Sequence, residues 1–117
     1  MLNHVFLQGR LVRDVELRST QSGTSVATLT VAVDRDYARD GASDKTDFVN
    51  VVCWKQTAEF ISKHFGKGRM IAVTGRLQSR TYDDKNGSKH YVTEVIVEQA
   101  SFTGEPKQTE QEEEIPY

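Results

Sequence analysis

The sequence predicts an all-β fold with one helix, built as a five-stranded barrel and followed by a disordered acidic C-terminal tail. Five runs alternate apolar with polar residues, which is the pattern of strands that bury one face. Clusters of Gly, Asn, Asp and Ser lie between these runs, and such residues favour turns. The chain of 117 residues has the length of one domain.

The five predicted strands are spaced along the first hundred residues. Their ranges are 5–7, 26–33, 48–54, 70–77 and 91–97. Between the last two runs lies Asn86-Gly87, a strong hairpin signal because both residues tolerate a positive φ.

Residues 56–65 form the one predicted helix. Ala58, Ile61 and Phe65 recur at helical spacing on one side, and Gly66 is placed to end the helix. Five strands with a single helix before the fourth strand give the element order of an OB-fold barrel. The competing architecture, a β-sandwich, usually has more strands and no helix in mid-chain.

Charge divides the chain into a barrel domain, a linker and a tip. Residues 105–117 hold five acids and one base, a net charge of −4, whereas the other 104 residues carry 14 bases and 12 acids, a net charge of +2. Apolar periodicity stops at Gly104. We therefore expect an OB-fold domain over 1–103, a short disordered linker over 104–111 and an acidic tip over 112–117.

Cysteine usage and hydropathy bear on the cellular compartment. Cys53 is the only cysteine, which excludes an intramolecular disulfide and favours a reducing interior. The first residues have neither the basic start nor the apolar run of a signal peptide, and no apolar stretch is long enough to span a membrane. We therefore expect a cytoplasmic protein that has no membrane partner.

The third predicted strand presents one face to solvent. Side chains two residues apart share a face, so Val49, Val51 and Cys53 are expected in the core. The opposite face places a polar residue among large aromatic ones: Phe48, Asn50, Val52 and Trp54. Phe48 and Trp54 are then about 20 Å apart, at roughly 3.3 Å per residue.

The fourth strand repeats this pattern. Its apolar face is expected in the core and carries Ile71, Val73, Gly75 and Leu77. Its other face combines two arginines with a tyrosine if the strand continues into the hairpin: Thr74, Arg76, Gln78, Arg80 and Tyr82. A loop after the second strand also places an aromatic residue between two cations: Arg35, Tyr37 and Arg39.

Aromatic residues among cations match the chemistry of single-stranded nucleic acid. Each unpaired base offers a π-face, worth about 1–3 kcal/mol in stacking, and each phosphate needs a positive charge. The expected stacking residues are Tyr37, Phe48, Trp54 and Tyr82. The expected cationic contacts are Arg35, Arg39, Arg76 and Arg80, with Lys45, Lys55 and Lys89 as weaker candidates. Taken singly, each aromatic is more often a packing residue and each cation a solvated one, but as a set they favour nucleic-acid binding over a plain barrel.

Two other classes of function stay open. A metal-dependent nuclease on the same barrel would draw its ligands from the aspartates Asp34, Asp36, Asp40, Asp83 and Asp84. Aspartate is favoured in loops and turns, the three histidines lack metal-ligand spacing, and Cys53 suits the core better than catalysis. We therefore expect no enzymatic activity, metal or cofactor. The second alternative is an OB-fold adaptor that acts mainly through protein-protein contacts, or an RNA-binding barrel.

Residues 1 to about 103 resemble the bacterial single-stranded DNA-binding protein family. The resemblance rests on motifs in a fixed order, including Leu7-Gln8-Gly9-Arg10-Leu11-Val12-Arg13-Asp14, Thr46-Asp47-Phe48-Val49-Asn50-Val51-Val52, Thr74-Gly75-Arg76-Leu77-Gln78-Ser79-Arg80 and Tyr91-Val92-Thr93-Glu94-Val95. It implies a nucleoid-associated homotetramer that wraps single-stranded DNA over aromatic and basic surfaces. The family's stacking positions fall on the four aromatics named above, and the family pairs its subunits through the first strand. Here residues 2–7 carry apolar groups on both faces, as an interface strand or a strand buried in its own barrel would.

The acidic tip ends in apolar residues, which a purely solubilising tail does not need. It comprises Glu112, Glu113, Glu114, Ile115, Pro116 and Tyr117. The apolar side chains suit a pocket on a partner, and the acids can steer the tip toward a positive surface. The tip resembles the family's tails, in which acids precede Ile-Pro-Phe or Leu-Pro-Phe. That resemblance implies docking on replication, recombination and repair proteins.

Overall fold

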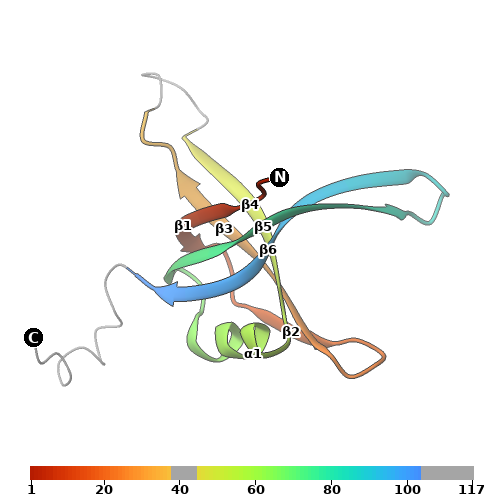
Figure 1. Cartoon of the computed structure of the whole chain (residues 1–117), viewed down its shortest axis with the longest axis horizontal. Helices are drawn as coiled ribbons and strands as arrows, with labels where there is room; N and C mark the ends of the chain where they lie inside the picture. The colour runs from red at the N-terminus through yellow and green to blue at the C-terminus, as the bar shows by residue number, and fades with distance from the viewer. Residues whose placement is uncertain (38–44, 104–117) are drawn as a thin grey trace, which may run out of the picture.

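The computed structural model describes residues 1–37 and 45–103, whose arrangement Figure 1 shows. In this part of the chain the elements are β1 (Val5–Leu11), β2 (Glu16–Ser19), β3 (Ser25–Asp34), β4 (Thr46–Trp54), α1 (Lys55–His64), β5 (Met70–Asp83) and β6 (Lys89–Phe102). The predicted linker at 104–111 and tip at 112–117 lie outside the described residues. Among the residues that are described, no helix is both long and apolar enough to cross a membrane.

The strands form one sheet that closes into a barrel. Their order is β1-β5-β6-β4-β3-β2, and β1 also pairs with β3 to close the sheet. β1 and β2 pair with successive parts of β3, since Leu11 lies opposite Val31 and Glu16 lies opposite Thr28. The two segments therefore act as one barrel strand, interrupted at residues 12–15. This arrangement confirms the predicted five-stranded OB-fold barrel with one helix.

Several strands extend beyond the predicted ranges. β2 was not predicted at all, because its four residues are all exposed and show no alternation between buried and exposed positions. β5 continues to Asp83 and β6 begins at Lys89, so the two strands form a long hairpin that projects from the barrel (Figure 1). Backbone pairing carries the hairpin past the point where the apolar alternation ends.

The core fills the interior of the barrel. Most predicted core residues are buried, among them Val51, Cys53, Ala58, Ile61, Phe65, Ile71 and Val73. The prediction for Leu77 was wrong, because this side chain lies on the projecting hairpin and is 47% exposed. Val52, predicted on the solvent face, is only 6% exposed because Ile96 of β6 lies beside it.

The ends of α1 differ from the prediction by one residue. Phe65 lies in extended backbone, with φ of −123°, and its N–H donates to the carbonyl oxygen of Ile61 at 2.9 Å. Phe65 is therefore the C-cap rather than the last helical residue. Gly66 does not supply a left-handed cap, since the positive φ in this connection belongs to Gly68, at 82°.

Candidate nucleic-acid interface

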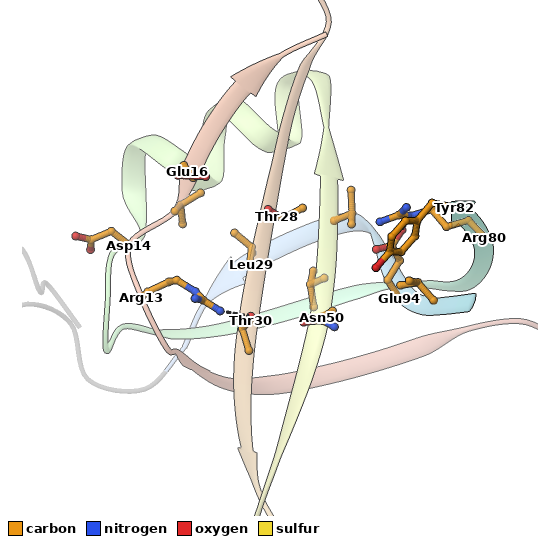
Figure 2. A pocket seen from close by; sticks show the side chains of 14 residues that line it. Arg13, Asp14, Glu16, Thr28, Leu29, Thr30, Asn50, Arg80, Tyr82 and Glu94 are labelled. Atoms are coloured by element: carbon orange, nitrogen blue, oxygen red, sulfur yellow. Dashed lines mark hydrogen bonds and ion pairs between the residues drawn. The ribbon is translucent and has the colours of Figure 1, made fainter. Parts of the chain in front are cut away.

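A hollow of about 840 Å³ opens on the outer face of the barrel. Figure 2 shows residues of β3 and β4 at its centre, Arg13 reaching in from one side, and residues of the β5–β6 hairpin on the other side. Its polar lining includes Arg13, Thr28, Thr30, Asn50, Arg80, Tyr82 and Glu94. Residues of β3, β4, β5 and β6 and of the interrupted β1–β2 segment line the hollow, so it extends across several strands, as a site for an extended polymer would.

Strand register explains why these side chains meet. Thr30 of β3 lies opposite Asn50 of β4, and Tyr82 of β5 lies opposite His90 of β6. The pair Val52 and Ile96 joins β4 to β6, so the outer faces of the two strand pairs become continuous. The structure therefore places the predicted outer residues of β4 and β5 on one surface.

Arg80 forms the main ion pair in the hollow. Its Nε donates to Oε1 of Glu94 at 2.8 Å, and the Glu94 side chain is only 7% exposed whereas that of Arg80 is 49% exposed. The hydrogen bond that Arg80 donates to Glu94, together with the negative charge of that carboxylate, raises the pKa of the Arg80 guanidinium above its usual value. The Arg80 guanidinium also lies 5.8 Å from the centre of the Tyr82 ring.

Tyr82 is held by the residue opposite it in the hairpin. The rings of Tyr82 and His90 stack with centroids 5.0 Å apart and planes inclined by 16°. His90 Nε2 in turn lies 2.8 Å from Oδ2 of Asp84. Hydrogen bonding from His90, helped by the backbone N–H groups of Ser88 and Asn86, lowers the pKa of the Asp84 carboxyl. Tyr82 thus has a fixed position while 46% of its surface stays exposed.

The turn of the hairpin decides which residues face the hollow. Gly87 has φ of 82°, Asn86 does not adopt a positive φ, and Asp84 N–H donates to the carbonyl oxygen of Ser88 at 3.0 Å. The resulting register pairs Asp83 with Lys89, so by strand alternation Lys89 lies on the face opposite Tyr82 and His90. Lys89 therefore does not join the predicted surface.

The remaining predicted aromatics are exposed on either side of the hollow. Phe48 is 65% exposed and Trp54 is 41% exposed, at the two ends of β4, and both share the strand face of Asn50. Tyr37, which follows β3, is 93% exposed. Neither these three nor any other aromatic except Tyr82 lines the hollow itself within the described part of the chain.

The predicted cations differ in their surroundings. Arg35 donates two hydrogen bonds to the carboxylate of Asp47, at 2.8 and 3.1 Å. This contact is the main reason why the pKa of the Asp47 carboxyl is lowered. Arg76 donates to Oε1 of Gln78 at 2.9 Å. Lys45 and Lys55 are exposed near the two ends of β4, whereas Arg39 lies outside the described residues.

Three residues that hold this site together were not predicted. Arg13 donates to Oγ1 of Thr30 at 3.1 Å, and His90 and Glu94 are described above. Glu94 follows Val92 by two residues, so alternation alone places it on the same outer face.

The alternative of a metal-dependent nuclease requires metal ligands that lie close together, and the described residues do not supply such a group. Across residues 1–37 and 45–103, no three His, Cys, Asp or Glu side chains are placed to hold a metal ion. Asp34 accepts a hydrogen bond from the Thr46 hydroxyl at 2.9 Å, and Asp84 accepts from turn N–H groups. Cys53 is fully buried, and this burial raises the pKa of its thiol to about 11. Asp40 lies outside the described residues.

Comparisons with known proteins all point to one family. Residues 2–103 match the Single-strand binding protein family. The chain is 44% identical over 117 residues to Single-stranded DNA-binding protein 1 of Staphylococcus aureus (strain MSSA476), which covers all of this chain and 74% of that protein. It is 48% identical over 98 residues to the Single-stranded DNA-binding protein of Streptococcus pneumoniae serotype 4, covering 84% of this chain and 63% of that protein. On the evidence of its barrel, its exposed aromatic face and these matches, the chain belongs to the Single-strand binding protein family, whose members bind DNA and are not enzymes.

Proposed function

We propose that this chain binds single-stranded DNA along its outer face with little regard for sequence. The observation that carries the proposal is the exposure of Phe48, Trp54 and Tyr82 on one continuous surface around the hollow. Each ring offers a flat face to a base whatever its identity, at about 1–3 kcal/mol per stacked base. Duplex DNA keeps its base faces covered, so the same surface discriminates against it.

The cellular role that fits this activity is protection of single strands during DNA replication, recombination and repair. Such strands arise at the nucleoid in the cytoplasm, where we place the protein. We further propose that residues 112–117 recruit other replication, recombination and repair proteins. The support is chemical: three consecutive acids precede Ile115, Pro116 and Tyr117, a combination suited to an apolar pocket with a basic rim.

We also propose that the chain assembles as a homotetramer through the side of the barrel that β1 forms. Phe6 is 74% exposed on β1. It borders a second hollow of about 410 Å³, which has both apolar and polar lining residues, among them Ala72, Thr74 and Gln99. A large exposed phenylalanine surrounded by polar groups on a strand surface is typical of a contact between subunits. Light scattering on the purified protein measures the number of subunits directly.

A fluorescence titration tests the proposed activity. Trp54 is the only tryptophan, so its emission reports on one proposed stacking position. We expect strong quenching by oligo-dT and little quenching by a duplex of equal length, at both low and high salt. Absence of quenching, together with absence of binding by anisotropy, would leave an OB-fold adaptor that acts mainly through protein-protein contacts. Tighter binding of a matched ribo-oligonucleotide would instead favour an RNA-binding role.

A further inference from the structure

The hollow carries more acid than base, which is unexpected for a surface that binds a polyanion. Three carboxylates line it, Asp14, Glu16 and Glu94, against two guanidiniums, Arg13 and Arg80. Arg80 is paired with Glu94 at 2.8 Å, so this cation brings no net charge to the hollow. Phosphates therefore gain little by entering, and the neutral parts of a nucleotide fit this space better.

Glu94 has an oxygen that is not committed to another residue. Its Oε1 accepts from Arg80, whereas no donor in the described part of the chain contacts its Oε2. Among the described residues, only Nε of Arg69 is a fully buried side-chain N or O atom that lacks a hydrogen-bond partner. Because Oε2 of Glu94 also lacks a partner, it is not fully buried and is accessible from the hollow. A carboxylate with low exposure and an open lone pair is a strong acceptor for a donor that enters.

The neighbouring polar groups do not discriminate between bases. The amide of Asn50 and the hydroxyls of Thr28 and Thr30 each donate as well as accept hydrogen bonds. An ionised carboxylate only accepts. Of the three carboxylates that line the hollow, Asp14 and Glu16 are exposed to water, whereas Glu94 is buried. Glu94 is therefore the acceptor for which water competes least, and the one best placed to distinguish one base from another.

We propose that the hollow is a nucleobase subsite in which Glu94 accepts a hydrogen bond from an exocyclic amine. This inference rests on the proposed binding of single-stranded DNA and adds a local preference to an otherwise sequence-tolerant surface. Cytosine, adenine and guanine carry such an amine, and pairing of a carboxylate with the cytosine amine is a common readout. Thymine and uracil offer only an N–H between two carbonyl oxygens, which the carboxylate repels.

The test compares two strands that differ at the pyrimidine 4-position. Equal lengths of oligo-dC and oligo-dU are titrated at fixed salt against the wild-type chain, E94Q and E98Q. Glu98 is exposed on β6 outside the hollow, so E98Q removes the same charge without touching the proposed subsite. We expect the dC-to-dU affinity ratio to fall about tenfold in E94Q, since the glutamine amide presents a donor to the uracil carbonyl, and to stay within twofold in E98Q.

A second measurement needs no variant. Replacing cytosine by pyrimidin-2-one removes the amine and adds no bulk, and we expect binding to the wild-type chain to weaken several-fold. Unchanged binding of that strand, or an equal gain in affinity for both strands in E94Q, would overturn the subsite and indicate a phosphate contact instead. Failure of the wild-type chain to bind any of these strands would remove the proposed function itself.

Discussion

Tyr82 and Tyr91 provide a matched pair of substitutions that tests the assigned face. Both are exposed tyrosines of the same hairpin, but Tyr82 faces the hollow beside His90 whereas Tyr91 lies on the other side, opposite Thr81. We expect Tyr82→Ala to weaken binding of single-stranded DNA strongly. Tyr91→Ala removes an even more exposed ring, but from the other face of the hairpin. We therefore expect it to change the affinity for single-stranded DNA by less than about twofold.

The size of the Tyr82 effect follows from its contacts. Loss of one base-stacking ring costs about 1–3 kcal/mol, which corresponds to a roughly 5- to 150-fold increase in Kd. The effect on folding is smaller, because the ring is half exposed and its main contact is the stack on His90. An aromatic pair of this kind contributes about 1 kcal/mol, so the Tm falls by roughly 4–8 °C.

Anisotropy titrations with labelled oligo-dT measure both variants, with Tyr82→Phe as the conservative control. Tyr82→Phe keeps the ring and should bind within about threefold of wild type, since stacking does not need the hydroxyl. Thermal denaturation confirms that each variant is folded at the assay temperature. Equal losses in Tyr82→Ala and Tyr91→Ala, or a larger loss in Tyr91→Ala, would refute the assignment of the binding face.

Three further predictions concern the tip, the barrel and the hairpin turn. Deletion of residues 112–117 should leave oligo-dT binding unchanged or tighter, because an anion that competes for the surface is removed; clearly weaker binding in anisotropy would contradict this. Gly75→Ala should lower the Tm markedly, at a cost of about 1–3 kcal/mol, because an added Cβ meets the backbone of Ile96 where β6 bulges; a Tm equal to that of wild type would show that the strands can separate without cost. Because His90 lowers the Asp84 pKa in the folded state, this contact stabilises the protein above the ordinary pKa of 3.8, and the stabilisation is lost as the pH falls through the lower folded value. The Tm of Asp84→Asn should therefore depend less on pH in this acidic range than that of wild type, and identical profiles would argue against the contact.

Much of the proposed binding surface follows from the strand period alone. In β4 the alternation separates buried Val51 and Cys53 from exposed Phe48 and Trp54, and in β5 it groups Arg80 with Tyr82. These assignments need no tertiary information, because a side chain two residues away always lies on the same face. The sequence therefore determined the barrel, the helix and the identity of the exposed aromatic residues.

Other features depend on which strands lie beside each other. Leu77 has the same apolar character as Ile71, yet it is half exposed because it lies on the part of β5 that projects from the barrel, away from the buried core cluster. The strand β2 exists because β3 offers it a free edge, although none of its own residues is buried. Apolar character states what a residue gains by burial but not whether the fold provides a covering layer.

The residues that line the hollow likewise depend on the tertiary structure. A three-residue turn at Lys85, Asn86 and Gly87 fixes the register that places His90 against Tyr82 and turns Lys89 away. A shift of one residue would exchange the two faces of β6 and remove Glu94 from Arg80. Composition and alternation leave this choice open, because it depends on backbone hydrogen bonds across the hairpin and on the backbone angles of the turn.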